Sequence, residues 1–333
     1  MDEFSCKVCL NKNGNTPFLA KEMMFGTKDM FEYYECNHCG CLQIKSVPNN
    51  ISEYYPPNYY SFKNVTSPPL YNFLQNIRIY FRKKRSNYIV EKKGLFGKLI
   101  YYFSDKYIEN KICWDWFKKT GTNADSKILD VGCGNGSLLT FLDTQGFKDL
   151  TGIDPYINSM SDLVFGLKLN HKIYKKTIDK LEGNYDLIML HHSLEHMENP
   201  FFVMNNINRL LKDGCYVLIR IPLADSYAWE KYRTDWVQLD APRHLFIYTL
   251  KSFEIISKKT GFKIIDVVYD STSFQFTGSE LYLKNISLEY VSKKNGINSF
   301  FPEEEIKKFE KDADELNKLK KGDQACIFLK KLI

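Results

Sequence analysis

The sequence predicts an α/β fold in which helices cover both faces of a mostly parallel sheet. From residue 127 onward, short apolar runs alternate with amphipathic stretches, as strands and helices do in such folds. The first run enters a glycine-rich turn that precedes a helical stretch. With 333 residues, 44% of them hydrophobic, the chain can bury a full core and carry smaller additions. The predicted strands contain KILDVGC, LTGIDP, HKIYK, YDLIMLHH and CYVLIRIPL.

Two further strand-like segments, residues 261–270 and 324–333, lie toward the end of the sequence. We expect them to pair antiparallel at the end of the sheet. The residues between them, about 271–322, have a helical pattern and are predicted to form an insertion. Pro302 and the three glutamates after it start one of these helices, because acidic side chains favour the N-terminal end of a helix dipole. Thr249 is predicted to cap an earlier helix.

The chain divides into three predicted parts. Residues 1–46 contain two Cys-x-x-Cys pairs and are expected to form a small separate unit. Residues 47–120 begin as a connector rich in Pro, Asn, Tyr and Ser and continue as helices that cover the core. Residues 121–333 are expected to form the α/β domain with its helical insertion.

The two cysteine pairs predict a zinc site. Each pair places two thiolates on one tight turn, and two such turns complete a tetrahedral site with four sulfur ligands. A site with four thiolates has no open position for water, so the zinc is expected to be structural. His38 and Cys41 are alternative ligands, and a redox-active dithiol is the alternative function. The predicted ligands are Cys6, Cys9, Cys36 and Cys39.

The formal net charge of +6 is modest and does not by itself indicate nucleic-acid binding. Residues 78–93, however, concentrate lysine and arginine around the single acid Glu91. This segment either attracts a phosphate-bearing substrate or an anionic membrane surface, or is a solvated helix face. No apolar run of transmembrane length and no signal-peptide profile is present, so we expect a cytoplasmic protein whose membrane contact, if any, is peripheral. The oligomeric state stays open.

Residues 128–136, with the sequence ILDVGCGNG, run from a strand into a glycine-rich turn. Glycines let the backbone approach a ligand where a Cβ would collide. Asp154 ends the next strand, where a carboxylate can accept both hydroxyls of a ribose. The third glycine comes too early for a dinucleotide loop, and Asp130 would repel a pyrophosphate. An acid at that place suits a cationic amino-acid group instead.

These segments resemble the class I S-adenosylmethionine-dependent methyltransferases. ILDVGCGNGSLL is similar to their first motif, GIDP to the second, YDLIMLHHSLEHMENP to the segment around the fourth strand, and LLKDGCYVLIRIP to the helix and strand that follow. The resemblance covers about residues 120–270. It implies a Rossmann-like, seven-stranded sheet with one antiparallel terminal strand, and an enzyme that uses S-adenosylmethionine.

The same resemblance implies a set of cofactor-binding residues. The glycine loop and Asp130 would line the methionine end, and Asp154 would hold the ribose. Pro155 or Tyr156 would flank the adenine, and Ile178 or Asp179 would cap its other face. For Asp130 and Cys133, plain packing of the turn is the alternative. The expected cofactor-binding residues are Asp130, Gly132, Cys133, Gly134, Gly136, Asp154, Pro155, Ile178 and His191.

The acceptor side is predicted from WVQLDAPRHLFIYT, which resembles an Asp-x-Pro-Arg-His segment of methyltransferases encoded with bacterial surface-polysaccharide enzymes. His244 is expected to be the general base, with His191 and His192 as further catalytic candidates. Arg243 would pair with a substrate phosphate or carboxylate, and Tyr227 and Trp236 would stack on a sugar. Alternatively, the segment only closes a loop, with Asp240 pairing Arg243 within the protein. Glu195 and His196 are expected to orient their loop.

We therefore predict methyl transfer from S-adenosylmethionine to a sugar-containing small molecule or glycan precursor of polysaccharide biosynthesis. Oxygen is the preferred acceptor atom over carbon or nitrogen. The first alternative is a nucleic-acid-binding methyltransferase that uses the zinc unit and the basic segment. Against it, the fourth strand ends in HHSL rather than in the Asn-Pro-Pro-Tyr type of motif found in base methyltransferases. A regulator that binds the cofactor without turnover is the second alternative.

Overall fold

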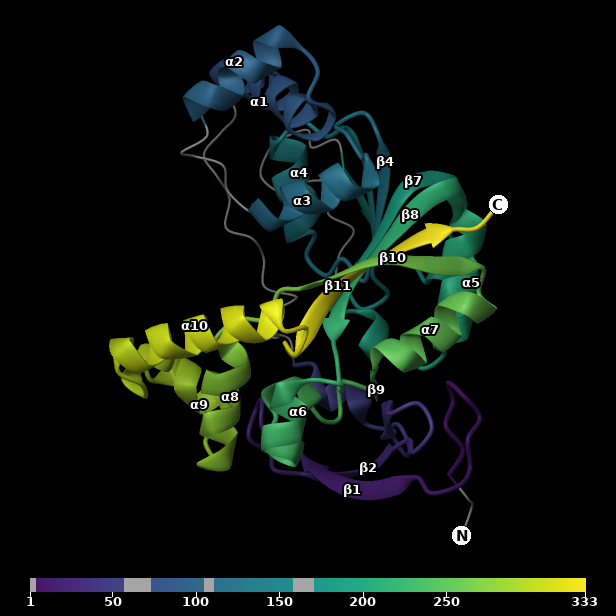
Figure 1. Ribbon diagram of the computed structural model, residues 1–333, viewed down its shortest axis with the longest axis vertical. Helices are drawn as coiled ribbons and strands as arrows, with labels where there is room; N and C mark the ends of the chain where they lie inside the picture. Colours follow the sequence, from purple (N-terminus) through teal and green to yellow (C-terminus); the bar gives the residue numbers. More distant parts are fainter. Residues whose placement is uncertain (1–3, 57–72, 105–110, 158–170) are drawn as a thin grey trace. The chain divides into compact units, whose positions relative to one another are not determined.

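The computed structural model describes residues 4–56, 73–104, 111–157 and 171–333 (Figure 1). They belong to two compact units. The first unit comprises Met1–Pro56, His192–Met204 and Ile219–Phe328, and the second comprises Pro57–His191, Asn205–Leu218 and Leu329–Ile333. Residues 57–72 of the predicted connector lie outside the described residues.

Seven strands form one sheet in the order β10-β11-β8-β7-β4-β5-β6 (Figure 1). Strand β4 pairs in parallel with β5 and β7, and β5 pairs in parallel with β6. This order confirms the predicted α/β fold, and it makes the two C-terminal strands neighbours. The strands are β4 (Lys127–Val131), β5 (Asp149–Ile153), β6 (Lys172–Tyr174), β7 (Tyr185–His191), β8 (Leu211–Pro222), β10 (Phe262–Tyr269) and β11 (Gln324–Lys331).

The central strands are apolar on both faces because helices cover both faces of a parallel sheet. In β4, every residue after Lys127 is buried, and in β7 five of the seven residues are buried. Two polar residues, Asp130 and His191, lie toward the carboxyl ends of these strands. Their position is the one at which open α/β sheets bind ligands.

Helices of the second unit precede the sheet and connect its strands. Helix α4 starts at Ser137, directly after the glycine-rich loop, which ends at the N-cap Gly136. The helices are α1 (Phe73–Glu91), α2 (Leu95–Ser104), α3 (Lys111–Thr120), α4 (Ser137–Thr144) and η4 (Ile178–Lys180), with α5 (Pro200–Leu210) beginning in the first unit and ending in the second.

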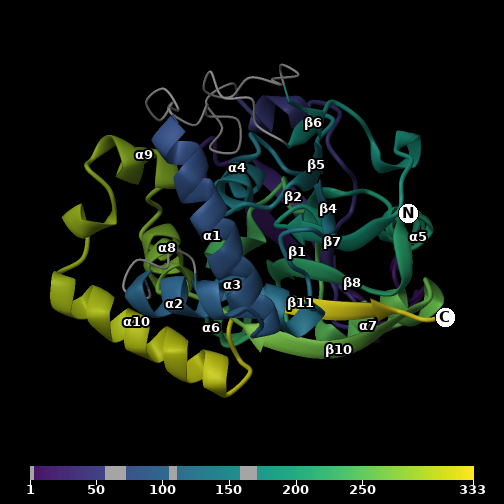
Figure 2. The ribbon, with the colours of Figure 1, turned by 90° about the horizontal axis from the view of Figure 1, so that it is seen from above.

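Helices of the first unit lie partly in the predicted insertion. Helices α8, α9 and α10 follow β10 and precede β11, and Figures 1 and 2 show them grouped together. They share a small core around Leu281, Val291 and Phe301. Thr249 caps α7 as predicted, in a reciprocal arrangement with Ser252. The helices are η1 (Ile51–Tyr54), η5 (Leu194–His196), α6 (Tyr227–Tyr232), η6 (Arg233–Asp235), η7 (Val237–Leu239), α7 (Leu250–Lys259), α8 (Phe274–Leu283), α9 (Leu288–Lys293), η8 (Ile297–Ser299) and α10 (Glu303–Lys318).

A second sheet, of four strands, lies in the first unit in the order β1-β2-β3-β9. The N-terminal strands pair antiparallel, and β3 pairs antiparallel with β9, where Leu42 faces Ile247. Residues far along the chain therefore complete the sheet of the predicted N-terminal unit, whose boundary at residue 46 stays a prediction. The strands are β1 (Thr16–Lys21), β2 (Met30–Glu35), β3 (Leu42–Ile44) and β9 (Phe246–Ile247).

Within the described residues, no helix combines the length and the apolar character needed to cross a lipid bilayer.

Candidate functional site

The loop between β4 and α4 has a backbone shape that favours glycine. Gly132, Gly134 and Gly136 have positive φ angles of 76°, 53° and 73°, which strain any residue with a Cβ. A Cβ at Gly136 would also lie 2.1 Å from Cδ1 of Ile173. The amide of Gly132 donates to the carbonyl of Ile153 at 2.8 Å. The loop is thereby held at the carboxyl ends of β4 and β5.

Asp154 follows β5 directly and holds the loop from the neighbouring strand. Its Oδ2 accepts a hydrogen bond from the amide of Gly134 at 3.0 Å, and its Oδ1 accepts one from the amide of Tyr156 at 2.8 Å. These two hydrogen bonds orient the side chain at the glycine loop. Each carboxylate oxygen can accept a further hydrogen bond. Pro155 and Tyr156, which were predicted to lie beside an adenine, are exposed.

Asp130 is a buried carboxylate at the end of β4. Among the described residues, its Oδ1 has no hydrogen-bond partner. Burial, and to a smaller extent the nearby Asp154, raises the pKa of Asp130 to about 7. A buried carboxylate that lacks a partner is unfavourable, and a cationic or hydrogen-bond-donating ligand would relieve this cost. The carboxylate of Asp130 therefore fits the α-ammonium group of an amino-acid moiety.

The remaining predicted cofactor residues differ in their surroundings. A Cβ at Gly152 would lie 2.6 Å from Sγ of Cys133, so this side chain fills space within the turn. Burial raises the pKa of the Cys133 thiol well above its ordinary value, which keeps it protonated. Ile178 is buried in η4. His191 lies against the ring of Trp116, with 4.8 Å between the ring centroids.

A cluster of one carboxylate and two imidazoles lies in the first unit. Glu195 and His196 belong to η5, shortly after β7, and His244 precedes β9. Their potential ligand atoms lie within 4.8 Å of one another, with 4.0 Å between Nε2 of His244 and Oε1 of Glu195. Glu195 is fully buried, and its carboxylate faces the imidazole rings of this cluster.

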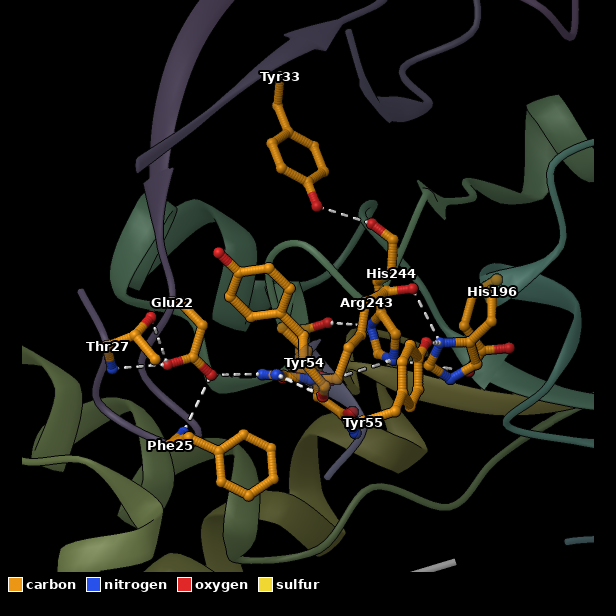
Figure 3. Close-up of polar contacts among 12 residues, drawn as sticks. Glu22, Phe25, Thr27, Tyr33, Tyr54, Tyr55, His196, Arg243 and His244 are labelled. Atoms are coloured by element: carbon orange, nitrogen blue, oxygen red, sulfur yellow. Dashed lines mark hydrogen bonds and ion pairs between the residues drawn. The ribbon is translucent and has the colours of Figure 1, made fainter. Parts of the chain in front are cut away.

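Hydrogen bonds to main-chain carbonyls determine which nitrogen of each imidazole carries the proton (Figure 3). Nδ1 of His244 lies 2.7 Å from the carbonyl oxygen of Gln238, and Nδ1 of His196 lies 2.9 Å from that of Arg243. Because a carbonyl only accepts, each Nδ1 must donate, and each Nε2 keeps a lone pair in the neutral ring. The hydroxyl of Tyr55 also lies 3.1 Å from Nδ1 of His196.

The electrostatics of the cluster keep His244 neutral and Glu195 charged. Burial, together with the neighbouring His196, lowers the pKa of His244 to about 4, although Asp240 and Glu195 act in the opposite direction. For Glu195, burial alone would raise the pKa, but the facing histidines bring it below its ordinary value. The lone pair on Nε2 of His244 therefore lies beside a carboxylate, with a second imidazole, that of His196, in the same cluster. Such a group can take a proton from a hydroxyl or hold a divalent cation.

His192 makes different contacts from the other two histidines of the first unit. Its Nε2 lies 2.9 Å from NH1 of Arg220, which can only donate, so this nitrogen is the acceptor. Arg220 is fixed in turn by an ion pair with Asp270 at 2.6 Å. Nδ1 of His192 lies 3.4 Å from Oε1 of Glu195. His192 thus links Glu195 to the Arg220 ion pair, and its acceptor nitrogen is already used.

Arg243 is fully buried, contrary to a role in binding a substrate phosphate. Its guanidinium pairs with Glu22 at 2.9 Å and with Asp240 at 2.6 Å, and it donates to the carbonyl of Tyr54 at 3.4 Å (Figure 3). Glu22 in turn accepts a hydrogen bond from the amide of Phe25 at 2.9 Å. These internal acceptors correct the expectation for Arg243, because its charge is neutralised within the protein.

The two aromatic residues expected to stack on a sugar differ in their exposure. Trp236 is fully buried, and its Nε1 donates to Asp323 at 3.0 Å. Both faces of its ring are therefore covered by protein, which corrects the expectation that it stacks on a substrate. Tyr227 is partly exposed and contacts the ring of Phe276 at its edge, with centroids 6.4 Å apart.

The four predicted zinc ligands come together in the first unit. Their sulfur atoms lie within 4.8 Å of one another, with 3.6 Å between Cys6 and Cys39 and 3.4 Å between Cys9 and Cys36. This spacing suits a tetrahedral ion with sulfur ligands. Sγ of Cys41 is directed to the carbonyl of Leu42 instead, at 3.6 Å.

Comparison with known proteins agrees with this arrangement. Residues 104–267 match a family model described as a methyltransferase domain. The ubiquinone biosynthesis O-methyltransferase of Rickettsia canadensis is 32% identical over 182 residues, which are 49% of this chain and 73% of that protein. The chain belongs to the S-adenosylmethionine-dependent methyltransferases.

A further relative and a solved structure are also similar to this methyltransferase. The ubiquinone biosynthesis O-methyltransferase of Rickettsia bellii is 35% identical over 104 residues, which are 29% of this chain and 43% of that protein. The chain therefore spans about two fifths of that relative's length. Among solved structures, it is similar to the O-methyltransferase of a trans-AT PKS multienzyme from Brevibacillus brevis in complex with S-adenosyl-L-homocysteine. That likeness has 17% identity and a TM-score of 0.42, and it covers 81% of this chain and 82% of the other.

Proposed function

We propose that this methyltransferase transfers the methyl group of S-adenosylmethionine to a hydroxyl oxygen of a small molecule. The observation that carries the proposal is the pair of carboxylates on either side of the glycine loop. Asp130 is buried, and its Oδ1 has no hydrogen-bond partner among the described residues, while Asp154 is oriented by two backbone amides. The family assignment and the names of the relatives support the same activity.

The two carboxylates would hold opposite ends of the cofactor. Asp130 would face the α-ammonium group, whose positive charge compensates the buried carboxylate. Asp154 would accept hydrogen bonds from the two ribose hydroxyls. The glycines between them adopt positive φ angles, which would strain any residue with a Cβ. When bound, S-adenosylmethionine would supply an electrophilic methyl group on its sulfonium.

On the acceptor side, the proton of the hydroxyl has to leave as its oxygen bonds to the methyl carbon. We assign this proton to Nε2 of His196, which is partly exposed, whereas His244 is buried. His244 and Glu195 would then position that ring and stabilise the imidazolium that forms. This assignment replaces His244 as the preferred base, because the Nε2 of His244 is directed to Glu195 and Asp240.

The proposal also concerns the chemical class of the molecule that accepts the methyl group. The curated relatives are named for ubiquinone biosynthesis, while the sugar-containing acceptor is supported by the Asp-x-Pro-Arg-His segment alone. The internal pairing of Arg243 and the burial of Trp236 remove two of the residues that favoured a sugar. We therefore place a non-sugar hydroxyl acceptor ahead of a glycan precursor.

The test is turnover with methyl-labelled S-adenosylmethionine and two acceptor panels, one of phenols and hydroxylated ring compounds and one of nucleotide sugars and glycan precursors. Mass spectrometry would locate the label. We expect an O-methylated product from the first panel. A labelled glycan would instead restore the sugar acceptor. Binding of the cofactor without any labelled product from either panel or from cell extract would contradict the proposed activity.

We further propose that the four clustered cysteines hold one structural Zn²⁺. Its support is the sulfur spacing given above and the absence of an open position in a site with four thiolates.

A further inference from the structure

Helices α1 and α2 of the second unit form a hairpin, with the turn at Lys92 to Gly94. Gly97 of α2 packs directly on α1, since a Cβ there would lie 2.4 Å from the carbonyl oxygen of Lys84. The rings of Tyr88 and Tyr101 meet across the same contact, with centroids 5.7 Å apart. One side of α2 is thereby fixed against α1.

The other side of α2 is apolar and exposed. Five of its seven large hydrophobic residues are exposed, with relative exposures from 48% to 87%, while Ile100 and Tyr101 are partly buried. At 3.6 residues per turn, the positions of the five exposed residues fall on one continuous stripe of the helix. The residues of this stripe are Leu95, Phe96, Leu99, Tyr102 and Phe103. On a helix that packs on a protein core, an apolar stripe of this kind would normally be buried.

Helix α1 extends the exposed apolar surface. Ile77, Tyr80 and Phe81 are exposed and lie at helical spacing on one face. The ring of Phe81 contacts Phe96 of α2, with centroids 5.7 Å apart. Of the twenty exposed large hydrophobic residues among the described ones, eight lie on these two helices. We call these eight residues, on α1 and α2, the hairpin patch. A patch of this extent on a folded protein marks an interaction surface.

Exposed cations lie on the same two helices as the hairpin patch and on the turn between them. The exposed cations on α1, α2 and their turn are Arg78, Arg82, Lys84, Lys92, Lys93 and Lys98. The acid on this stretch is Glu91, and it is bound to Asn123. Lys84 and Lys92 lie over tyrosine rings, 5.5 Å from Tyr80 and 5.3 Å from Tyr88.

We propose that the hairpin patch attaches this protein peripherally to an anionic lipid bilayer, with the apolar stripe of α2 in the headgroup region. An apolar stripe together with a basic border provides the two signals that stable surface attachment needs. Lysine and arginine near an anionic surface each strengthen binding. Tyrosine and phenylalanine suit the boundary between headgroups and acyl chains.

A second copy of the chain fits the hairpin patch less well. A symmetric contact would bring two sets of these cations together without an acidic counterpart on the patch, and like charges placed together are unfavourable. A bilayer that contains anionic lipid supplies both the apolar layer and the negative charge. The proposal is independent of the methyl acceptor, so a protein without turnover would still bind vesicles.

The test is co-sedimentation of the full chain with vesicles of phosphatidylcholine, with and without phosphatidylglycerol. We expect binding to the anionic vesicles that weakens with added salt. The double variant Leu99→Ser with Phe103→Ser removes the stripe and should lower the affinity by about tenfold or more. The double variant Lys93→Glu with Lys98→Glu should lower it by about fivefold or more for each residue. The matched control, Tyr290→Ser with Leu319→Ser, removes two exposed apolar residues elsewhere and should bind as wild type.

A conservative variant keeps the test decisive if the serine variant fails to fold. Phe103→Trp preserves the stripe, and its added fluorescence should shift to the blue and be quenched by brominated lipid. Wild type that stays in solution with anionic vesicles would overturn the proposal, and so would equal binding by the control and both hairpin variants. A dimer in solution that the stripe variant dissociates, without vesicle binding, would assign the patch to a second copy and also overturn it.

Discussion

The glycine loop of the second unit and the histidine cluster of the first unit are built in different ways. The loop is formed by nearby residues, with Asp130 and Asp154 on adjacent strands and glycine turns between them. The cluster joins residues from η5 to His244, which lies beside an ion pair between Arg243 and Glu22, 221 positions apart. A site built from neighbouring residues can be predicted from their spacing in the sequence. A site assembled from distant segments can be predicted only in part.

The largest expected effect concerns the N-terminal cysteines, which complete the first unit. Removal of the zinc with a strong chelator should unfold the four-stranded sheet, because a structural zinc supplies folding energy of roughly 10 kcal/mol or more in small domains. Circular dichroism and metal analysis would follow the loss of about one zinc per chain. Cys215→Ser, which changes a cysteine outside the cluster, is the matched control. A purified chain without zinc that keeps its fold would disprove the site.

The next effect tests which histidine takes the proton. His196→Ala should lower kcat by about 10²- to 10⁴-fold, the range for loss of a general base, while cofactor affinity stays near that of wild type. His192→Ala should have a smaller effect on kcat, because its acceptor nitrogen is already used by Arg220. The measurement is the steady-state rate with labelled cofactor. Equal rates for His196→Ala and wild type would remove His196 from the proposed mechanism.

Substitution of Arg243 distinguishes a structural role of this residue from a role in substrate binding. Arg243→Ala leaves Glu22 and Asp240 without their cation and should lower the free energy of unfolding by about 3 to 5 kcal/mol, as for other broken buried pairs. Arg233→Ala breaks an exposed pair with Glu35 and should change it by less than about 1 kcal/mol. Urea unfolding would measure both. Unchanged stability with a raised KM would return Arg243 to the substrate.

The next effect concerns the affinity of the chain for the cofactor at Asp154. Asp154→Ala removes the acceptor for the ribose hydroxyls and should weaken cofactor binding by roughly 1.5 to 3 kcal/mol. Calorimetric titration with S-adenosylhomocysteine would measure the change. Asp179→Ala, at an exposed position of η4, should have little effect unless Asp179 caps the adenine. An unchanged dissociation constant for Asp154→Ala would remove Asp154 from the cofactor site.

The smallest expected effect is the pH dependence that Asp130 imparts. Its pKa of about 7 in the free chain means that the carboxyl group is increasingly protonated below that pH. Cofactor affinity should therefore fall by up to about tenfold per pH unit below pH 7. Without cofactor the sign is reversed, because the folded chain holds this proton more tightly than the unfolded chain does. Relative to Asp130→Asn, wild type should lose stability as the pH rises from about 4 to 7.

These contrasts show what could be predicted from the sequence. The parallel sheet, the cap at Thr249 and the convergence of the four cysteines follow from periodicity and spacing, and each is present in the structure. The burial of Trp236 was not predictable, because its partner Asp323 lies far along the chain. Glu195 and His196 were assigned to loop orientation, although their place directly after the fourth strand was a signal that could have included them. The hydrogen bond that fixes the tautomer of His196 is made with the main chain at Arg243, 47 positions further along the chain.

The most direct test of the central claim is calorimetric titration of the purified chain with S-adenosylhomocysteine and, separately, with a nicotinamide dinucleotide. A loop that holds an amino-acid group at Asp130 and a ribose at Asp154 should bind the first ligand at one site per chain and show no heat with the second. Binding of the dinucleotide without binding of S-adenosylhomocysteine would contradict the account.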